Sequence, residues 1–106
     1  MNSEKIIYNK LVRDKIPQII EKTGKKAEIA IYETNEFHEA LAEKLLEEGK
    51  EYIESKNVEE LADILEIIKK LLQLHGLSFK ELEEIQNIKK IERGAFDKKI
   101  KLLSVS

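Results

Sequence analysis

The sequence predicts a mainly α protein, a helical bundle with at most a small β decoration. Helix start and stop signals divide the chain into four segments, and the apolar residues inside them recur at helical spacing. Only two short stretches alternate as strands do. A chain of 106 residues is long enough for one hydrophobic core and too short for two, so we expect a single domain over residues 1–106.

The first expected helix is short. Asp14 can cap its N-terminus, and Pro17 is tolerated in its first turn. Gly24 provides a C-terminal stop. These signals predict a helix of about two turns.

The second and third expected helices form the centre of the chain. Residues 35–55 have a helical pattern, and Asn57 followed by Glu60 resembles a capping box that opens the next helix. That helix is expected to run to His75 and to stop at Gly76. A short turn would then join two antiparallel helices.

The fourth helix repeats the same start signal. Ser78 is followed by Glu81, and the apolar spacing continues to a stop at Gly94. Residues 27–32 alternate, and residues 100–105 are rich in β-branched and apolar types. These two stretches predict a sheet of two or three strands at most.

The composition limits the partners of the chain. With 19 basic and 21 acidic residues the formal charge is only -2, which favours neither nucleic acid nor an anionic membrane. No stretch approaches the roughly 18 apolar residues of a membrane span. The absence of cysteine suits a reducing compartment, so we expect a cytoplasmic protein.

Carboxylates occur on the apolar side of both central helices. With about 100° of rotation per residue, Glu48 lies inside the apolar stripe of residues 35–55, and Glu51 lies at its edge. In the next helix Glu60 lies within the apolar arc and Asp63 at its margin. An ionised carboxylate that faces a core is costly unless it is paired or bound to a metal.

The short turn between the two helices would bring the four carboxylates to one level. No lysine or arginine is expected at the matching inner positions, so we predict a divalent cation, and oxygen ligands indicate Mg²⁺ or Mn²⁺. The alternative for each carboxylate taken singly is a solvated surface charge. Glu60 is also explained as a capping residue.

These residues resemble a known signature. The segment from Glu47 to Glu51, followed by the segment from Glu60 to Asp63, is similar to the EExxE…ExxD motif of MazG-like all-α NTP pyrophosphatases. Residues 8–17, 74–76 and 92–96 resemble a small phosphoribosyl-ATP pyrophosphohydrolase-like branch of that superfamily. Together these segments extend over most of the chain.

The resemblance implies Mg²⁺-dependent hydrolysis of nucleoside triphosphates, noncanonical ones among them, to a monophosphate and pyrophosphate. Phosphate oxygens also require cations, and arginine suits them because of its planar fork. We expect a homodimer or homotetramer, because a domain this small often completes its core by association. The implied metal ligands are Glu48, Glu51, Glu60 and Asp63; Glu47 is expected to orient or deprotonate the attacking water, and Lys10, Arg13 and Arg93 to contact the substrate.

Two alternatives remain for the function. One is phosphoribosyl-ATP hydrolysis, and the other is a helical binding or assembly module without activity. Two features depart from the usual family pattern. Gly49 lies mid-helix, at a cost of roughly 1 kcal/mol relative to alanine, and only eight residues separate Glu51 from Glu60.

Overall fold

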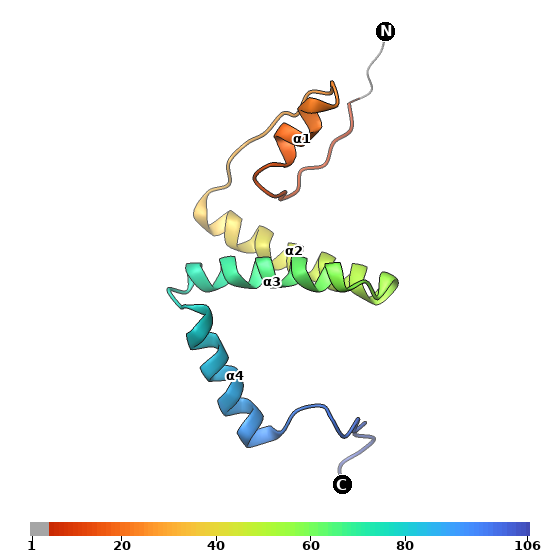
Figure 1. Ribbon diagram of the computed structural model, residues 1–106, viewed down its shortest axis with the longest axis vertical. Helices are drawn as coiled ribbons and strands as arrows, with labels where there is room; N and C mark the ends of the chain where they lie inside the picture. The colour runs from red at the N-terminus through yellow and green to blue at the C-terminus, as the bar shows by residue number, and fades with distance from the viewer. Residues whose placement is uncertain (1–4) are drawn as a thin grey trace. The chain divides into compact units, whose positions relative to one another are not determined.

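The computed structural model describes residues 5–106, which fold into α-helices joined by loops (Figure 1). The mainly α prediction is confirmed. In the described range the helices are α1 (Ile16–Lys22), α2 (Thr34–Ser55), α3 (Val58–Leu74) and α4 (Phe79–Arg93).

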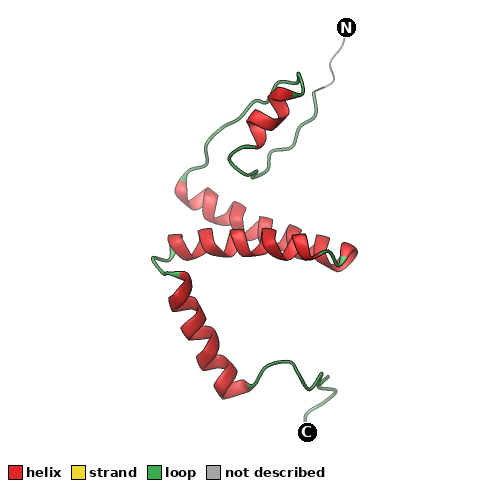
Figure 2. Ribbon diagram, in the orientation of Figure 1, coloured by secondary structure: helices red, strands yellow, loops and turns green. Residues whose placement is uncertain are grey.

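No strand occurs in residues 5–106, as Figure 2 shows. The two alternating stretches, residues 27–32 and 100–105, are loops. Alternation places side chains on two faces, but a strand forms only when its backbone groups pair with a neighbour. The small β decoration is therefore absent from this part of the chain.

The chain divides into two compact units, Met1–Leu71 and Leu72–Ser106. The first contains α1, α2 and most of α3, and the second contains α4 and the C-terminal segment. The single domain expected over residues 1–106 stays a prediction.

A tight link joins α2 to α3. Lys56 adopts a left-handed conformation with φ 56°, and its N–H bonds the carbonyl of Tyr52. The side-chain oxygen of Asn57 accepts the N–H of Glu59 at 2.9 Å, so Asn57 caps α3 as predicted. The N–H of Asn57 donates to Oγ of Ser55 at 3.1 Å and not to Glu60, so the second half of the predicted capping box is wrong. Because this link is so short, α2 and α3 lie side by side and antiparallel (Figure 1).

The start of α1 differs from the prediction. Lys15, and not Asp14, is the N-cap residue, and it makes no side-chain cap hydrogen bond. Pro17 lies in the first turn, where its missing N–H leaves one fewer donor to satisfy and its fixed φ suits the helix. The helix ends beside Gly24, which has φ 91°.

The signals around α4 behave as the sequence predicts. Gly76 has φ 71°, and the chain turns there so that the N–H of Leu77 bonds the carbonyl of Leu72 at 2.9 Å. Ser78 and Glu81 form both hydrogen bonds of the capping box, each 3.1 Å long. Both groups of this motif satisfy helix-end donors, which explains the sharp start of α4.

Few apolar side chains of the described residues are buried. These are Leu41, Ile67 and Leu72, and each keeps a few per cent of its surface exposed. Many large apolar side chains on α2 and α3 stay exposed instead. None of the described helices combines the length and the apolar character needed to cross a bilayer.

Candidate metal centre

Three carboxylates from α2 and α3 meet inside the first unit. Oxygen atoms of Glu48, Glu60 and Asp63 all lie within 4.8 Å of one another. Ligands of an octahedral Mg²⁺, with bonds of about 2.1 Å, are about 3.0 Å apart when adjacent and about 4.2 Å apart when opposite. These side chains would therefore have to move closer together to coordinate one such ion.

Glu48 is the most buried of the three carboxylates. It is only 6% exposed, and its Oε2 is buried without a hydrogen-bond partner. A buried polar atom left unsatisfied costs free energy, and a buried carboxylate costs more. The donor set is also all oxygen, which is what Mg²⁺ and Mn²⁺ prefer. The residues present thus fit a divalent cation.

The electrostatics of Glu48 agree with this fit. Burial raises the pKa of its carboxyl from 4.5 to about 7, and contacts with Glu60 and Glu51 and repulsion by Asp63 add to the effect. The neighbouring carboxylates favour the protonated form of Glu48 because like charges at short range repel. A divalent cation at this point would reverse that repulsion.

Glu51, the fourth predicted ligand, is placed differently. It is exposed and is not part of the group within 4.8 Å, although it is near enough to raise the pKa of Glu48. Its position three residues beyond Glu48 rotates it by about 60° to the rim of the helix face. The structure therefore forms the cluster from three of the four residues and leaves Glu51 beside it.

Basic residues from the segment before α1 contact Asp63 of the cluster and Glu47 beside it. Nη2 of Arg13 lies 2.6 Å from Oδ1 of Asp63 and donates a hydrogen bond to it. Nζ of Lys10 lies 3.5 Å from Oε1 of Glu47. Asn9, next to Lys10, has a left-handed backbone conformation with φ 47°. Two of the three predicted substrate-binding cations thus lie beside the acidic cluster.

Lys44 is the residue that the sequence reasoning missed. Its Nζ lies 3.2 Å from Oε2 of Glu47 and 3.8 Å from Oε1 of Glu48. The expectation that no cation occupies an inner position of the hairpin is therefore wrong. The signal was available, because residues three and four apart share a helix face. Lys44 does not hydrogen-bond Oε2 of Glu48, which remains unsatisfied.

Glu47 has a different environment from its neighbour Glu48. Its hydrogen bond with Lys44 lowers the pKa of Glu47, and the charge of Lys10 adds to the effect. Glu47 is consequently ionised at neutral pH and is held in place by two cations. Adjacent carboxylates of one helix thus have their pKa values moved in opposite directions.

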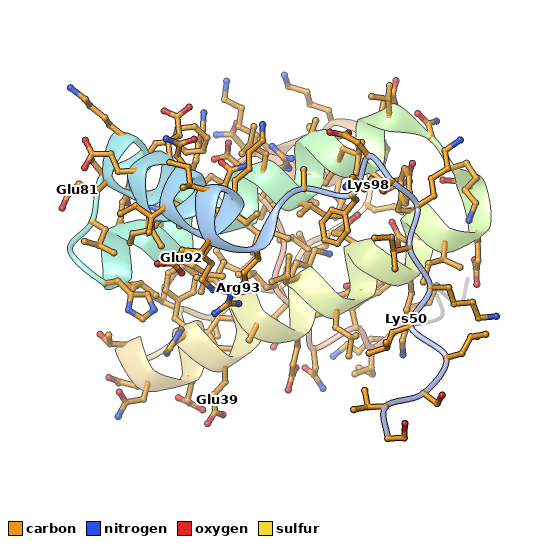
Figure 3. The ribbon with its side chains drawn as sticks, turned by 90° about the horizontal axis from the view of Figure 1, so that it is seen from below. Glu39, Lys50, Glu81, Glu92, Arg93 and Lys98 are labelled. Atoms are coloured by element: carbon orange, nitrogen blue, oxygen red, sulfur yellow. The ribbon has the colours of Figure 1, made fainter. Side chains whose placement is uncertain are left out.

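Arg93, the third predicted substrate contact, ends α4 in the second unit. Its side chain is labelled in Figure 3. The two units are not placed relative to each other, so its role at the carboxylates stays a prediction.

Comparison of the chain with models of protein families, with curated proteins and with solved structures finds no match. The resemblance to MazG-like pyrophosphatases thus rests on the motif residues themselves. The chemistry available at the cluster is cation binding by carboxylate oxygens, with an ionised carboxylate and two exposed cations alongside.

Proposed function

We propose that the chain is a Mg²⁺-dependent nucleoside triphosphate pyrophosphohydrolase of the MazG-like type. The observation that carries the proposal is the buried carboxylate of Glu48, whose Oε2 has no hydrogen-bond partner and which lies against Glu60 and Asp63. A fold that buries an unsatisfied acid among other acids pays a stability cost, and a bound cation removes that cost.

Glu48, Glu60 and Asp63 would hold the ion, and Glu51 at the rim is available as a further ligand or as a partner of its water shell. When bound, Mg²⁺ neutralises phosphate oxygens and lowers the pKa of a nearby water. Three protein carboxylates leave positions for substrate phosphates, which is the usual way in which Mg²⁺ is shared between protein and nucleotide.

In the proposed reaction water attacks the α-phosphorus, and the bond from that phosphorus to the oxygen bridging to the β-phosphate breaks. The products are a nucleoside monophosphate and pyrophosphate. Glu47 is suited to orient this water, because its pKa is lowered by Lys44 and Lys10 and an ionised carboxylate accepts a hydrogen bond from water. The same shift makes Glu47 a weak general base in this arrangement, since an efficient general base needs a pKa near the working pH. Deprotonation by Glu47 would require that these cations turn to the phosphates first.

Arg13 can exchange its carboxylate partner for a substrate phosphate. Its exposed side chain forms an ion pair with Asp63, and exposed ion pairs are weak. If Asp63 served as a ligand of a bound cation, the guanidinium of Arg13 would be free to bind triphosphate oxygens, which suit its planar, two-pronged donor geometry. Lys10 also forms an exposed ion pair, 3.5 Å long, with Glu47, and such a weak pair can give way to a phosphate.

The test is a pyrophosphate-release assay over a panel of canonical and noncanonical nucleoside triphosphates and phosphoribosyl-ATP, with Mg²⁺ and with a chelator. We expect metal-dependent turnover that is lost in Glu48→Gln and Asp63→Asn. Glu39→Gln is the matched control, because this exposed carboxylate of α2 points away from the hairpin (Figure 3) and its loss should leave turnover unchanged.

The outcomes separate the alternatives. Preference for phosphoribosyl-ATP would assign the narrower activity. If no substrate on the panel released pyrophosphate with metal, the catalytic proposal would fail, and metal-free nucleotide binding would then favour a module without activity.

A further inference from the structure

We infer that the segment before α1 binds a nucleotide lengthwise, with the base stacked on the ring of Tyr8 and the phosphates at Lys10 and Arg13. Tyr8 would thereby contact the end of the substrate that lies away from the metal, so the inference rests on the proposed function. The first observation is that Tyr8 is 68% exposed. In the described part of the first unit no aromatic side chain is more exposed.

The exposure of Tyr8 rules out a role in core packing. Aromatic residues of a small protein usually stabilise its core, and burial would explain Tyr8 without any ligand. Its neighbours Ile6 and Ile7 are also in solvent, at 67% and 68%. Large apolar side chains that are exposed together mark interaction sites more often than single ones do.

One cation connects the ring of Tyr8 with the carboxylates. Nζ of Lys10 lies over the ring, 5.9 Å from its centroid, and the same atom lies 3.5 Å from Oε1 of Glu47. The centroid is therefore no farther from this oxygen than the two distances placed end to end. That reach is comparable with the length of a mononucleotide from its base to its phosphates. A base on Tyr8 would thus leave the phosphates at the metal centre.

The segment is held in place at two points that follow the ring. Lys10 pairs with Glu47 of α2, and Arg13 pairs with Asp63 of α3. Loops held by a rigid scaffold are frequent positions of binding residues. Along the chain the aromatic ring comes first, and the ammonium and guanidinium groups follow. A nucleotide has the same order, from a flat base to charged phosphates.

The contact that now covers the ring of Tyr8 is weak enough to be replaced. Its 5.9 Å separation is close to the outer limit of about 6 Å for a cation–π contact, and such contacts contribute least at exposed sites. The side chain of Lys10 is 46% exposed. Stacking of a base on an aromatic ring is the stronger interaction. When Lys10 turns to a phosphate, a base can therefore occupy the ring face that the ammonium leaves.

Stacking on Tyr8 also defines the class of substrate. Every base has a π-face, so stacking tolerates canonical and noncanonical bases alike. Purines have a larger face than pyrimidines, and we expect purine nucleoside triphosphates to bind more tightly. A phosphate chain without a base gains nothing from Tyr8.

Calorimetry of the full chain with Mg²⁺ tests the inference without turnover. The two ligands are a nonhydrolysable purine nucleoside triphosphate and inorganic tripolyphosphate, which has no base. Tyr8→Leu should raise the dissociation constant of the nucleotide about tenfold and leave that of tripolyphosphate unchanged. Tyr8→Phe keeps the ring and should bind both ligands as the wild type does. Tyr32→Leu, at another exposed aromatic residue of the first unit, should change neither value.

Proton NMR provides a signal that a purely structural role of Tyr8 would not give. The ring current of a stacked base moves the ring protons of Tyr8 upfield. We expect this shift when the nucleotide is added with Mg²⁺ and not when tripolyphosphate is added. Circular dichroism checks that Tyr8→Leu and Tyr32→Leu remain helical.

The outcomes separate this inference from the proposed hydrolysis. If tripolyphosphate binds as tightly as the nucleotide, or if Tyr8→Leu weakens both ligands alike or neither, the inference is overturned and the hydrolysis is not. A loss of nucleotide binding in Tyr32→Leu in place of Tyr8→Leu overturns it as well. Nucleotide binding that depends on Tyr8, without pyrophosphate release, supports the inference and overturns the hydrolysis. If neither ligand binds, both fail.

Discussion

Replacing Glu48 by glutamine should stabilise the protein when no divalent cation is present. The pKa of Glu48 is raised from 4.5 to about 7, mainly by burial. Because the folded-state pKa lies above the unfolded one, the folded protein binds this proton more tightly, and stability falls as the pH rises from 4.5 to 7. Above that window the ionised carboxylate costs about 3 kcal/mol.

Glutamine has nearly the same shape and carries no charge at any pH. Without metal, Glu48→Gln should therefore be about 3 kcal/mol more stable than wild type at about pH 8 and nearly equal to it below about pH 4.5. Urea unfolding in chelator at several pH values, followed by far-UV circular dichroism, measures this difference. Glu39→Gln, an exposed carboxylate of the same helix, should show no such pH dependence.

Adding Mn²⁺ should invert the order of stability. The wild type gains stability as the ion binds the folded state, whereas Glu48→Gln gains little because it has lost a ligand. The reasoning is refuted if Glu48→Gln in chelator is no more stable than wild type at about pH 8. It is refuted equally if both proteins gain the same stability from Mn²⁺.

Three further changes have defined outcomes. Arg13→Gln frees Asp63 from its ion pair, so Mn²⁺ alone should bind about threefold tighter. The Mn²⁺ complex of a nonhydrolysable triphosphate should instead bind more weakly. Calorimetry shows whether the two effects have opposite sign. Lys44→Met removes the main cause of the lowered pKa of Glu47, and NMR titration should show that this pKa rises. An unchanged pKa would contradict the role of Lys44 in lowering it. Ser78→Ala removes the cap of α4 and should cost about 1 kcal/mol in urea unfolding, with a loss near zero counting against the cap.

The sequence predicted most reliably the features that depend on local chemistry. Ser78 and Glu81 form the expected capping box, and Gly76 supplies the left-handed turn after α3. Asn57 caps α3 as expected. Each of these signals acts over a few residues, so neither tertiary packing nor the rest of the chain was needed to interpret them.

The grouping of the carboxylates was also accessible from sequence. The helical rotation placed Glu48 and Glu60 on inner faces and Asp63 at a margin, and the structure brings these three together. The same calculation placed Glu51 at the edge of its stripe, where it is exposed. Asp63 and Glu51 are rotated alike, by about 60° from Glu60 and Glu48, so the rotation alone did not predict that Asp63 joins the cluster and Glu51 does not.

Contacts that depend on loops were beyond the sequence. The pairing of Arg13 with Asp63 joins residues 50 positions apart, and it depends on the path of the segment before α1. The two expected strands failed for a related reason, since alternation in residues 27–32 does not supply a hydrogen-bonding neighbour. Lys44 was different, because its spacing from Glu48 already indicated the contact.

Binding of Mn²⁺ to the wild-type chain and to Asp63→Asn tests the central claim most directly. Electron paramagnetic resonance of free Mn²⁺ measures it without substrate or turnover. The account predicts saturable binding to the wild type that Mg²⁺ displaces and that Asp63→Asn and Glu48→Gln abolish, while Glu39→Gln retains it. Absence of binding to the wild type, or equal binding to all four proteins, would contradict the claim that Glu48, Glu60 and Asp63 form a metal centre.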